Sequence, residues 1–303
     1  MASKPLLVVI AGATASGKTS TAISIAQHFG TEIISADSRQ IYTELSIGTA
    51  KPTTDELLQA KHHFINHISI HQKYDVATYR NEVLTQLQQL FTTHKIAVMC
   101  GGTGLYIRAV CDGLDEFPEI NHTTIEYVKS NYEKYGIEWL QHLLHEIDID
   151  YYKIVDLKNP YRLIRAAHVC IQTKLPYSSF RNKNNLSPFF DVLKIGLQMP
   201  REKLYERINL RVEQMMQNGL ENEAKENFDN KHLQAMQTVG YTELFNYFEN
   251  RISKDEAIHL IKQNSRHYAK RQITWFNKEK NLQWMEADAI EKILLKIKCK
   301  LNE

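Results

Sequence analysis

Short apolar runs rich in β-branched residues alternate with longer amphipathic segments along much of the chain. Such a run is typical of a strand buried on both faces of a parallel sheet, whereas apolar positions three and four residues apart indicate helices. The runs predict strands at residues 6–11, 32–35, 96–100 and 192–197. The amphipathic segments predict helices at residues 19–29, 55–63, 75–93, 201–218, 220–230 and 254–277. This alternation predicts an α/β fold with a parallel sheet flanked by helices.

The pattern changes after Pro118, where strand signals become rare. Helical spacing continues over residues 125–147 and 161–174, and the polar stretch at residues 180–188 predicts a loop. We therefore expect an all-α domain inserted into the α/β fold. The expected domains are a core of residues 1–118 and 189–303 and a helical insertion of residues 119–188.

The composition is that of an ordinary globular protein, with 303 residues, 43% hydrophobic and 24% charged. No apolar run approaches the roughly 20 residues that span a bilayer, and the run at residues 6–11 leads into glycines rather than a cleavage site. We therefore expect a cytoplasmic protein without membrane association. The four cysteines form no CxxC pair, which favours reduced thiols. Because the formal net charge is only +2, a nucleic-acid site must be a local patch.

Residues 12–19, GATASGKT, match the P-loop pattern G-x-x-x-x-G-K-[ST] between a predicted strand and a predicted helix. The glycines let successive backbone N–H groups point at one anion, and the helix adds the positive end of its dipole. Lys18 supplies a charge, and the Thr19 hydroxyl can hold Mg²⁺. The motif predicts a P-loop NTPase-like core and leaves open whether the ligand is ATP. The expected phosphate-binding residues are Gly12, Ala13, Thr14, Ala15, Ser16, Gly17, Lys18 and Thr19.

Two further segments follow predicted strands, where ligands bind in open parallel sheets. Asp37 is a candidate general base or metal-associated carboxylate, or simply a turn aspartate. The turn at residues 101–106, GGTGLY, either brings Thr103 close to a substrate or only starts a helix. The strand at 96–100 ends in a cysteine and glycines rather than in the acid that holds Mg²⁺ in ATP-hydrolysing P-loop proteins, which argues against a plain ATPase.

Basic residues gather on two predicted helices. Arg207 and Arg211 lie four residues apart, as a phosphate clamp or a solvated face. Six basic residues and one acid lie between residues 261 and 280, beside several aromatics, which fits either a phosphate-tracking surface or a solvated helix. These basic residues are Lys262, Arg266, Lys270, Arg271, Lys278 and Lys280. The histidines His62, His63 and His67 lack companion ligands, so packing is expected rather than a metal role.

In these motifs the chain resembles one family, the tRNA dimethylallyltransferases, also called tRNA isopentenyltransferases. The matching segments follow the family's order and cover nearly the whole chain. They are GATASGKT at 12–19, ISADSRQIY at 34–42, IGTAKP at 47–52, HHFI at 62–65, GGTGLY at 101–106, NPYRLIRA at 159–166, YERINLRVEQMMQNGL at 205–220, TVGYTEL at 238–244 and YAKRQITWF at 268–276.

The resemblance implies that the P-loop binds dimethylallyl diphosphate. The dimethylallyl group would move to N6 of the adenosine just 3′ of the anticodon, tRNA position 37, in tRNAs that read codons beginning with U, and diphosphate would leave. Lys18, Arg211 and a Mg²⁺ cofactor would stabilise the diphosphate charge, with Thr19 on the metal. Asp37 would accept the N6 proton and Thr103 would contact the target base, which must leave its stack.

The resemblance also implies the partner surface, the anticodon stem-loop of tRNA, and makes the helical insertion part of it. The basic helix adds Arg266, Lys270 and Arg271, and we expect the protein to act as a monomer. The implied tRNA contacts are Asp37, Ser38, Arg39, Gln40, Thr103, Tyr161, Arg162, Leu163, Ile164, Arg165, Gln237, Thr238, Val239, Gly240, Tyr241 and Thr242.

The chain departs from the family pattern in the insertion. Ile125 and Glu126 stand where a basic residue is frequent, His168 stands in place of a glutamate, and the turn at 173–176 lacks the family glycine. Two other classes of function remain open at this point. A P-loop kinase would use Asp37 as base for a hydroxyl and would consume ATP. A non-catalytic RNA-binding module would not depend on Asp37.

Overall fold

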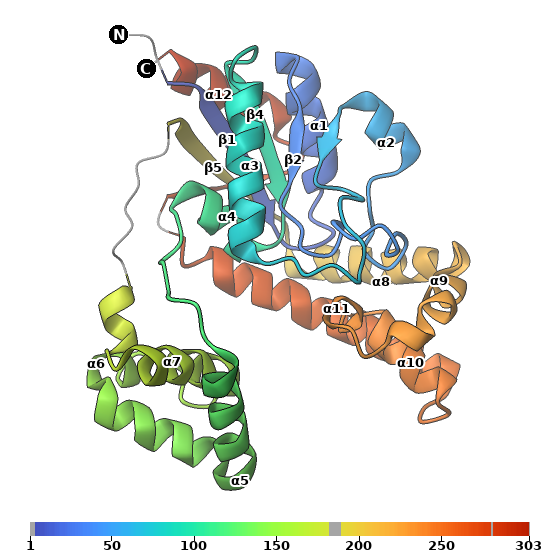
Figure 1. Cartoon of the computed structure of the whole chain (residues 1–303). Coiled ribbons are helices and arrows are strands. Elements are labelled where there is room, and N and C mark those ends of the chain that lie inside the picture. The colour runs from blue at the N-terminus through green and yellow to red at the C-terminus, as the bar shows by residue number, and fades with distance from the viewer. Residues whose placement is uncertain (1–3, 182–188, 280, 303) are drawn as a thin grey trace. The chain divides into compact units, whose positions relative to one another are not determined.

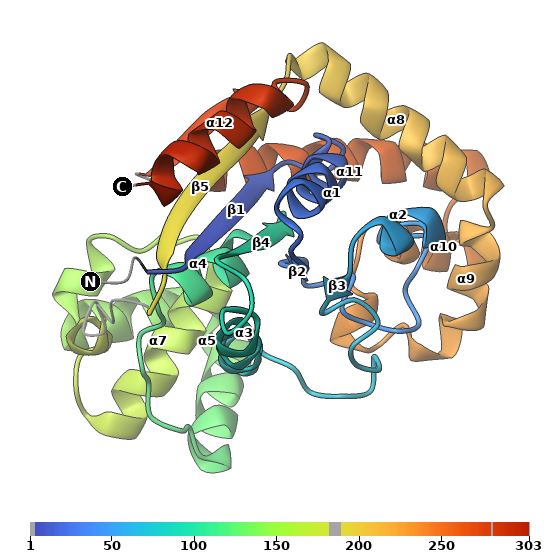
Figure 2. The same cartoon turned by 90° about the horizontal axis from the view of Figure 1, so that it is seen from above.

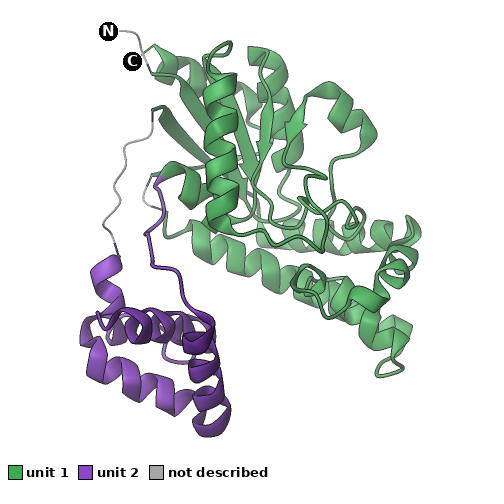
Figure 3. Ribbon diagram, viewed as in Figure 1, with its two compact units in different colours: residues 1–111, 188–303 green, residues 112–187 purple. Residues whose placement is uncertain are grey.

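The computed structural model describes residues 4–181, 189–279 and 281–302 (Figure 1). The chain forms two compact units, which are coloured separately in Figure 3. Unit 1 consists of Met1–Cys111 and Pro188–Glu303, and unit 2 of Asp112–Ser187. Within the described ranges, no helix is both long enough and apolar enough to cross a bilayer.

Unit 1 is built on a parallel sheet with the strand order β3-β2-β4-β1-β5-β6. The strands are β1 (Leu6–Gly12), β2 (Ile33–Ser35), β3 (His62–His63), β4 (Ile96–Gly101), β5 (Asp191–Gln198) and β6 (Leu282–Glu286). The four strands expected from sequence are confirmed as β1, β2, β4 and β5. The expected helix at 55–63 is wrong at its end, because α2 (Thr54–Gln59) stops before Ala60, which is extended, and β3 then pairs with β2.

Alternate residues of the strands point to two separate cores, as expected for a sheet covered on both faces. On one face, Leu6, Val8 and Ile10 pack with α1 (Lys18–Phe29) and α12 (Ile290–Leu301). On the other face, Leu7 and Val9 pack with α3 (Val76–Leu90), α4 (Gly104–Cys111) and the end of α11 (Lys254–Phe276). Figures 1 and 2 show these helical layers around the sheet. The α/β prediction is therefore confirmed.

Four α-helices lie between β5 and β6 along the chain, and two of them pack against the loop that follows β1. These are α8 (Arg201–Gln217), α9 (Leu220–Glu226), α10 (Tyr241–Phe248) and α11. Ala13 and Ala15 of the loop pack against Leu204 and Ile208 of α8 and Ala269 of α11, so the loop rests on two helices. The expected helix at 220–230 is shorter, since α9 ends at Glu226 and a 3₁₀ turn, η2 (Phe228–Asn230), follows.

Glu223 of α9 holds the turn that contains Gly48. Its carboxylate accepts hydrogen bonds from the backbone N–H groups of Ser46, Ile47 and Gly48 at 2.9, 2.8 and 2.9 Å, and from the Tyr241 hydroxyl at 2.5 Å. A Cβ at Gly48 would lie 2.6 Å from the Tyr241 ring, so only glycine fits there. One carboxylate therefore ties three segments of unit 1 together.

Unit 2 is all-helical and has its own core. Its elements are α5 (His122–Ile147), α6 (Ile149–Tyr152), α7 (Pro160–Thr173) and the 3₁₀ turn η1 (Tyr177–Phe180). The two expected helices are confirmed, with a break in α5 at Gly136, whose φ is 73°. Val128, Leu140 and Leu163 are buried in this core. Most of the loop expected at 180–188 lies outside the described residues.

The four hydrogen bonds to the Glu223 carboxylate predict that its removal will strongly reduce the stability of unit 1. The change Glu223→Ala leaves three backbone N–H groups and a buried hydroxyl without their acceptor, so we expect the free energy of unfolding to fall by about 2–4 kcal/mol. Urea denaturation measures this change. The control Glu221→Ala removes only the solvent-exposed ion pair with Lys254 and should cost far less. Equal losses in the two variants would contradict the structural role of Glu223.

Candidate active site at the carboxyl edge of the sheet

The loop at residues 12–19 connects β1 to α1 as the sequence predicts. Gly12 and Gly17 have φ values of 146° and 93°, and Ala15 has a φ of 64°, so the backbone curls before the helix begins. Repeated reversals of this kind turn successive N–H groups toward one side, where the N-terminus of α1 adds its dipole. The local geometry is that of an anion cradle.

Two cations and an unsatisfied hydroxyl lie in this cradle. Lys18 is half-buried and its Nζ donates to the Ala13 carbonyl at 2.6 Å. Burial lowers the pKa of Lys18 to about 8, opposed by the charge of Asp37 and assisted by that of Arg211. Arg211 of α8 donates to the Thr14 hydroxyl at 3.4 Å. The Ser16 hydroxyl is 1% exposed and has no hydrogen-bond partner among the described residues, as expected where an anion supplies the acceptor.

The donor set around Thr19 fits a Mg²⁺ ion shared with a bound diphosphate. Thr19 is half-buried at the first turn of α1, in the position that the motif assigns to a metal ligand. Within the described parts of the chain, no three His, Cys, Asp or Glu side chains come together as an all-protein metal site. Mg²⁺ commonly keeps several waters and binds substrate phosphates with few protein ligands, so the Thr19 hydroxyl is the side chain that would hold it here.

Asp37 lies just beyond β2 on the same edge of the sheet. Its Oδ1 accepts from the backbone N–H groups of Arg39 and Gln40 at 2.9 and 3.3 Å, so the turn-aspartate interpretation holds for this oxygen. The Oδ2 atom makes no hydrogen bond to any described residue. The carboxylate is therefore oriented by one oxygen and has the other available for chemistry.

The neighbours of Asp37 have structural contacts. Arg39 donates to the backbone carbonyls of Gln234, Ala235 and Gln237 at 3.2–3.4 Å. Gln40 donates to the carbonyls of Thr49 and Ala50, in the turn that Glu223 holds. The expected contact segments at 37–40 and 237–242 are thus brought together, and the Arg39 and Gln40 side chains hold the Asp37 turn in place.

Thr103 joins the turn after β4 to the Asp37 turn. Its hydroxyl accepts from the Ser38 N–H at 3.0 Å and donates to the Ser38 hydroxyl at 3.3 Å. On α11, burial and the charge of Asp37 raise the pKa of Tyr268, which lies near this turn. Asp37, Thr103 and the phosphate loop therefore lie on one edge of the sheet, as the sequence predicts.

Helix α11 packs directly on this turn through residues that sequence reasoning did not assign to the site. Gln272 is buried and bonds to both Thr14 and Gly102, and Trp275 packs where a Cβ at Gly104 would lie only 2.0 Å from its Nε1. The signal available from sequence was a polar residue at 272 between the apolar positions Ala269 and Phe276, at helical spacing.

The basic stripe of α11 divides into two parts. Lys262 pairs with Glu213 at 2.7 Å and Arg266 donates to Asn209 at 2.7 Å, so both tie α11 to α8. Lys270 and Arg271 are exposed. Lys280, which counted toward the stripe, lies outside the described residues. Among the described residues of the stripe, Lys270, Arg271 and Lys278 present their charges to solvent.

The other expected tRNA contacts differ in exposure. On α7, Tyr161, Arg162 and Arg165 are exposed, whereas Leu163 is fully buried and Ile164 packs against the same core. In the segment before and within α10, Gln237 and Thr242 are exposed, Thr238 and Val239 are half-buried, and Gly240 and Tyr241 are buried. Because burial prevents side-chain contact with a ligand, Leu163 and Tyr241 serve the cores of their units.

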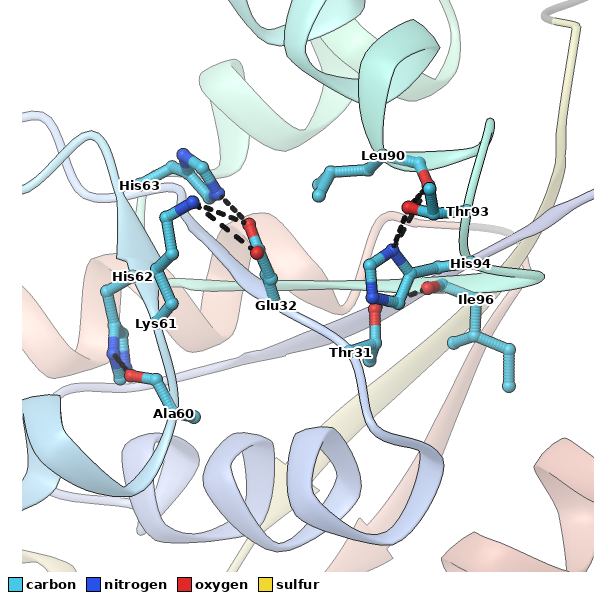
Figure 4. Close-up of polar contacts among 10 residues, drawn as sticks. All are labelled: Thr31, Glu32, Ala60, Lys61, His62, His63, Leu90, Thr93, His94 and Ile96. Carbon is cyan, nitrogen blue, oxygen red and sulfur yellow. Dashed lines mark hydrogen bonds and ion pairs between the residues drawn. The ribbon is translucent and has the colours of Figure 1, made fainter.

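The three neighbouring histidines have ordinary partners. The His63 ring meets Glu32 at 2.5 Å, beside Lys61, and His62 bonds to the Ala60 carbonyl (Figure 4). Burial opposes the charge of Glu32, but the hydrogen bonds from His63 and Lys61 outweigh it and lower the Glu32 pKa. His67 pairs with Glu82 at 2.8 Å.

Comparison with known proteins shows the family to which the chain is related. A family model described as IPP transferase matches residues 40–279. A protein named tRNA dimethylallyltransferase from Christiangramia forsetii is 48% identical over 297 residues, covering 98% of each chain, and one of the same name from Cytophaga hutchinsonii is 42% identical with the same coverage.

Solved structures agree with these relatives. The full-length tRNA isopentenylpyrophosphate transferase of Bacillus halodurans is 33% identical, with a TM-score of 0.73 over 99% of this chain and 97% of that one. A eukaryotic dimethylallyltransferase acting on tRNA shares the fold, with a TM-score of 0.81 at 22% identity over 93% of this chain and 74% of that one.

The sheet, its glycine loop and the polar residues beside it define a P-loop-like group-transfer enzyme. Within that class the chain belongs to the IPP transferase family. This membership confirms the resemblance, and it makes the chain a prenyltransferase instead of a P-loop kinase or a non-catalytic RNA-binding module.

Proposed function

We propose that this chain transfers a dimethylallyl group from dimethylallyl diphosphate to N6 of adenosine 37 in tRNAs that read codons beginning with U. The observation that carries the proposal is the meeting of an anion cradle with an oriented carboxylate. Lys18 lies close enough to Asp37 for the carboxylate to affect the lysine's pKa, and Thr103 connects the Asp37 turn to the turn after β4.

The cradle suits a diphosphate leaving group. Breaking the allylic C–O bond leaves negative charge on the diphosphate oxygens, and preorganised donors are most effective where charge develops. The loop N–H groups, Lys18, Arg211 and the unsatisfied Ser16 hydroxyl would receive this charge. Bound Mg²⁺, held by Thr19 and the diphosphate, would add a positive charge on the same oxygens.

The acceptor side suits an exocyclic amine. Asp37 would take the N6 proton on its Oδ2 as the new C–N bond forms, while its Oδ1 keeps the turn fixed. Thr103, next to Ser38, would contact the flipped adenine. The tRNA surface would include the exposed Lys270 and Arg271 in unit 1 and the exposed residues of α7 in unit 2.

A transfer assay tests the proposal and separates catalysis from turn geometry. The protein is mixed with dimethylallyl diphosphate, Mg²⁺ and an unmodified tRNA that reads a U-initial codon, and mass spectrometry locates the product. One adenosine, at position 37, should gain the prenyl group without ATP. The variant Asp37→Asn keeps the Oδ1 acceptor, so it should lose about 10²–10⁴-fold in kcat with tRNA affinity unchanged. An unchanged kcat would remove Asp37 as the base.

The Lys18 pKa predicts a pH dependence for donor binding. With its pKa lowered to about 8, Lys18 is charged below that pH and loses its proton above it. Because the anion binds the charged form, donor affinity should be level at lower pH and fall by about tenfold per pH unit above pH 8. Isothermal titration with dimethylallyl diphosphate measures this. Lys18→Arg, which stays protonated, should give a level profile, and a level profile in the unmodified protein would contradict the prediction.

The exposed part of the basic stripe predicts an electrostatic contribution to RNA binding. Lys270→Ala should weaken tRNA binding and reduce the slope of log affinity against log salt by about one unit. The matched control is Lys262→Ala on the same helix, whose charge is already paired with Glu213 and which should leave the slope unchanged. Fluorescence anisotropy over a salt series distinguishes the two. Equal slopes in all three proteins would show that Lys270 does not contact phosphate.

A further inference from the structure

Gln272 is a polar residue buried in the apolar face of α11. Its side chain is 6% exposed and lies between the buried residues Ala269 and Phe276. A primary amide loses free energy when it leaves water unless its donors and acceptor are paired. The contacts that satisfy Gln272 therefore explain why it occupies this position.

Both contacts of Gln272 are to backbone atoms of the site. Its Oε1 accepts from the Thr14 N–H at 2.8 Å, and its Nε2 donates to the Gly102 carbonyl at 3.0 Å. The two partners, one a donor and one an acceptor, fix the orientation of the amide. A Cβ at Gly102 would lie 2.1 Å from this Nε2, so the glycine gives the side chain its space.

The two partners belong to different halves of the proposed reaction site. Thr14 lies within the phosphate loop, and its hydroxyl accepts a hydrogen bond from Arg211. Gly102 directly precedes Thr103, which holds the Asp37 turn through Ser38. Gln272 is thus a single side chain that connects the loop for the leaving group with the turn for the acceptor base.

We propose that Gln272 is a positioning residue that sets the distance between the phosphate loop and the Thr103 turn. The inference rests on the proposed function and adds to it a residue that touches neither substrate. Its reason is geometric. Transfer between two bound substrates requires their reacting atoms in near contact, and a displacement of about 1 Å can cost on the order of 10²-fold in rate.

The variants Gln272→Met and Gln272→Glu test the proposal. Methionine fills the same space without either hydrogen bond, whereas glutamate keeps an acceptor for Thr14 and places a second oxygen against the Gly102 carbonyl. Gln272→Met should lower kcat by about 10²-fold, with the Kd of dimethylallyl diphosphate alone and of tRNA alone changed by less than about threefold. The control is Gln263→Met on the same helix, whose side chain has no hydrogen bond to any described residue, and it should match the unmodified protein.

A second measurement does not depend on prenyl transfer. Hydrogen exchange is followed with and without Mg²⁺ and pyrophosphate. In the unmodified protein and in Gln263→Met, the ligand should slow exchange at residues 12–19 and also, by about five- to tenfold, at residues 101–106. In Gln272→Met and Gln272→Glu, protection at 12–19 should persist and the response at 101–106 should be lost.

The outcomes separate the two proposals. If exchange at 101–106 responds through Gln272 but no prenyl group reaches tRNA, the proposed function fails and the positioning role stands. If pyrophosphate does not slow exchange at 12–19, or if 101–106 does not respond in the unmodified protein, the positioning role is wrong. It is also wrong if both Gln272 variants keep the response at 101–106, or if prenyl transfer occurs and Gln272→Met and Gln263→Met transfer with equal kcat.

Discussion

The contact between the ends of β2 and β4 is the constraint on which the site depends. A Cβ at Gly101 would lie 2.1 Å from the Ala36 carbonyl oxygen, so the two backbones meet with no room for a side chain. At this point Ala36 donates to the Cys100 carbonyl at 2.8 Å and accepts from the Thr103 N–H at 3.1 Å. Thr103 consequently reaches Ser38, and the Asp37 turn and the glycine turn become one structure. The next residue, Gly102, extends the contact to α11. Because Gly102 has no side chain, Gln272 can approach its backbone closely.

The charges of the site form a gradient along this edge. On the loop side, burial and the neighbouring Arg211 lower the pKa of Lys18, which means that its positive charge is poorly compensated in the protein alone. On the turn side, the Asp37 carboxylate is held in place by two backbone N–H groups. A ligand matches these charges when its negative end lies by Lys18 and its positive centre lies by Asp37. An allylic diphosphate becomes such a species as its C–O bond breaks.

The sequence predicts those parts of the molecule that depend on local pattern. Buried strands are visible as β-branched runs, and the P-loop is visible as a fixed spacing of Gly12, Gly17 and Lys18. The sequence could not show β3, which has two residues and exists only by pairing with β2. Nor could it show the partners of Gln272, since the bond to Thr14 spans 258 positions of the chain. Long-range contacts of this kind follow from packing, to which a single sequence gives no direct access.

The basic stripe shows the same limit at the level of side chains. Helical spacing correctly places Lys262, Arg266 and Lys270 on one side of α11, but it does not show what lies opposite. Lys262 pairs with Glu213 of α8, and Arg266 donates to Asn209 of α8. These two contacts hold α11, which carries Gln272, against α8, which carries Arg211. Their structural and electrostatic roles could be separated only once the neighbouring helix was known.

The end of β4 distinguishes this loop from those that hydrolyse nucleoside triphosphates. Cys100 stands there in place of an acid, and burial raises the pKa of its thiol to about 12, so it is neutral at physiological pH. A carboxylate at this position would hold a metal ion, but it would also repel the negative charge that develops on a departing diphosphate. With a neutral strand end, the Asp37 carboxylate lies on the acceptor side of the cradle. In the proposed reaction, a negative charge there would stabilise the positive charge that develops on the allylic carbon and would receive the proton of the attacking amine.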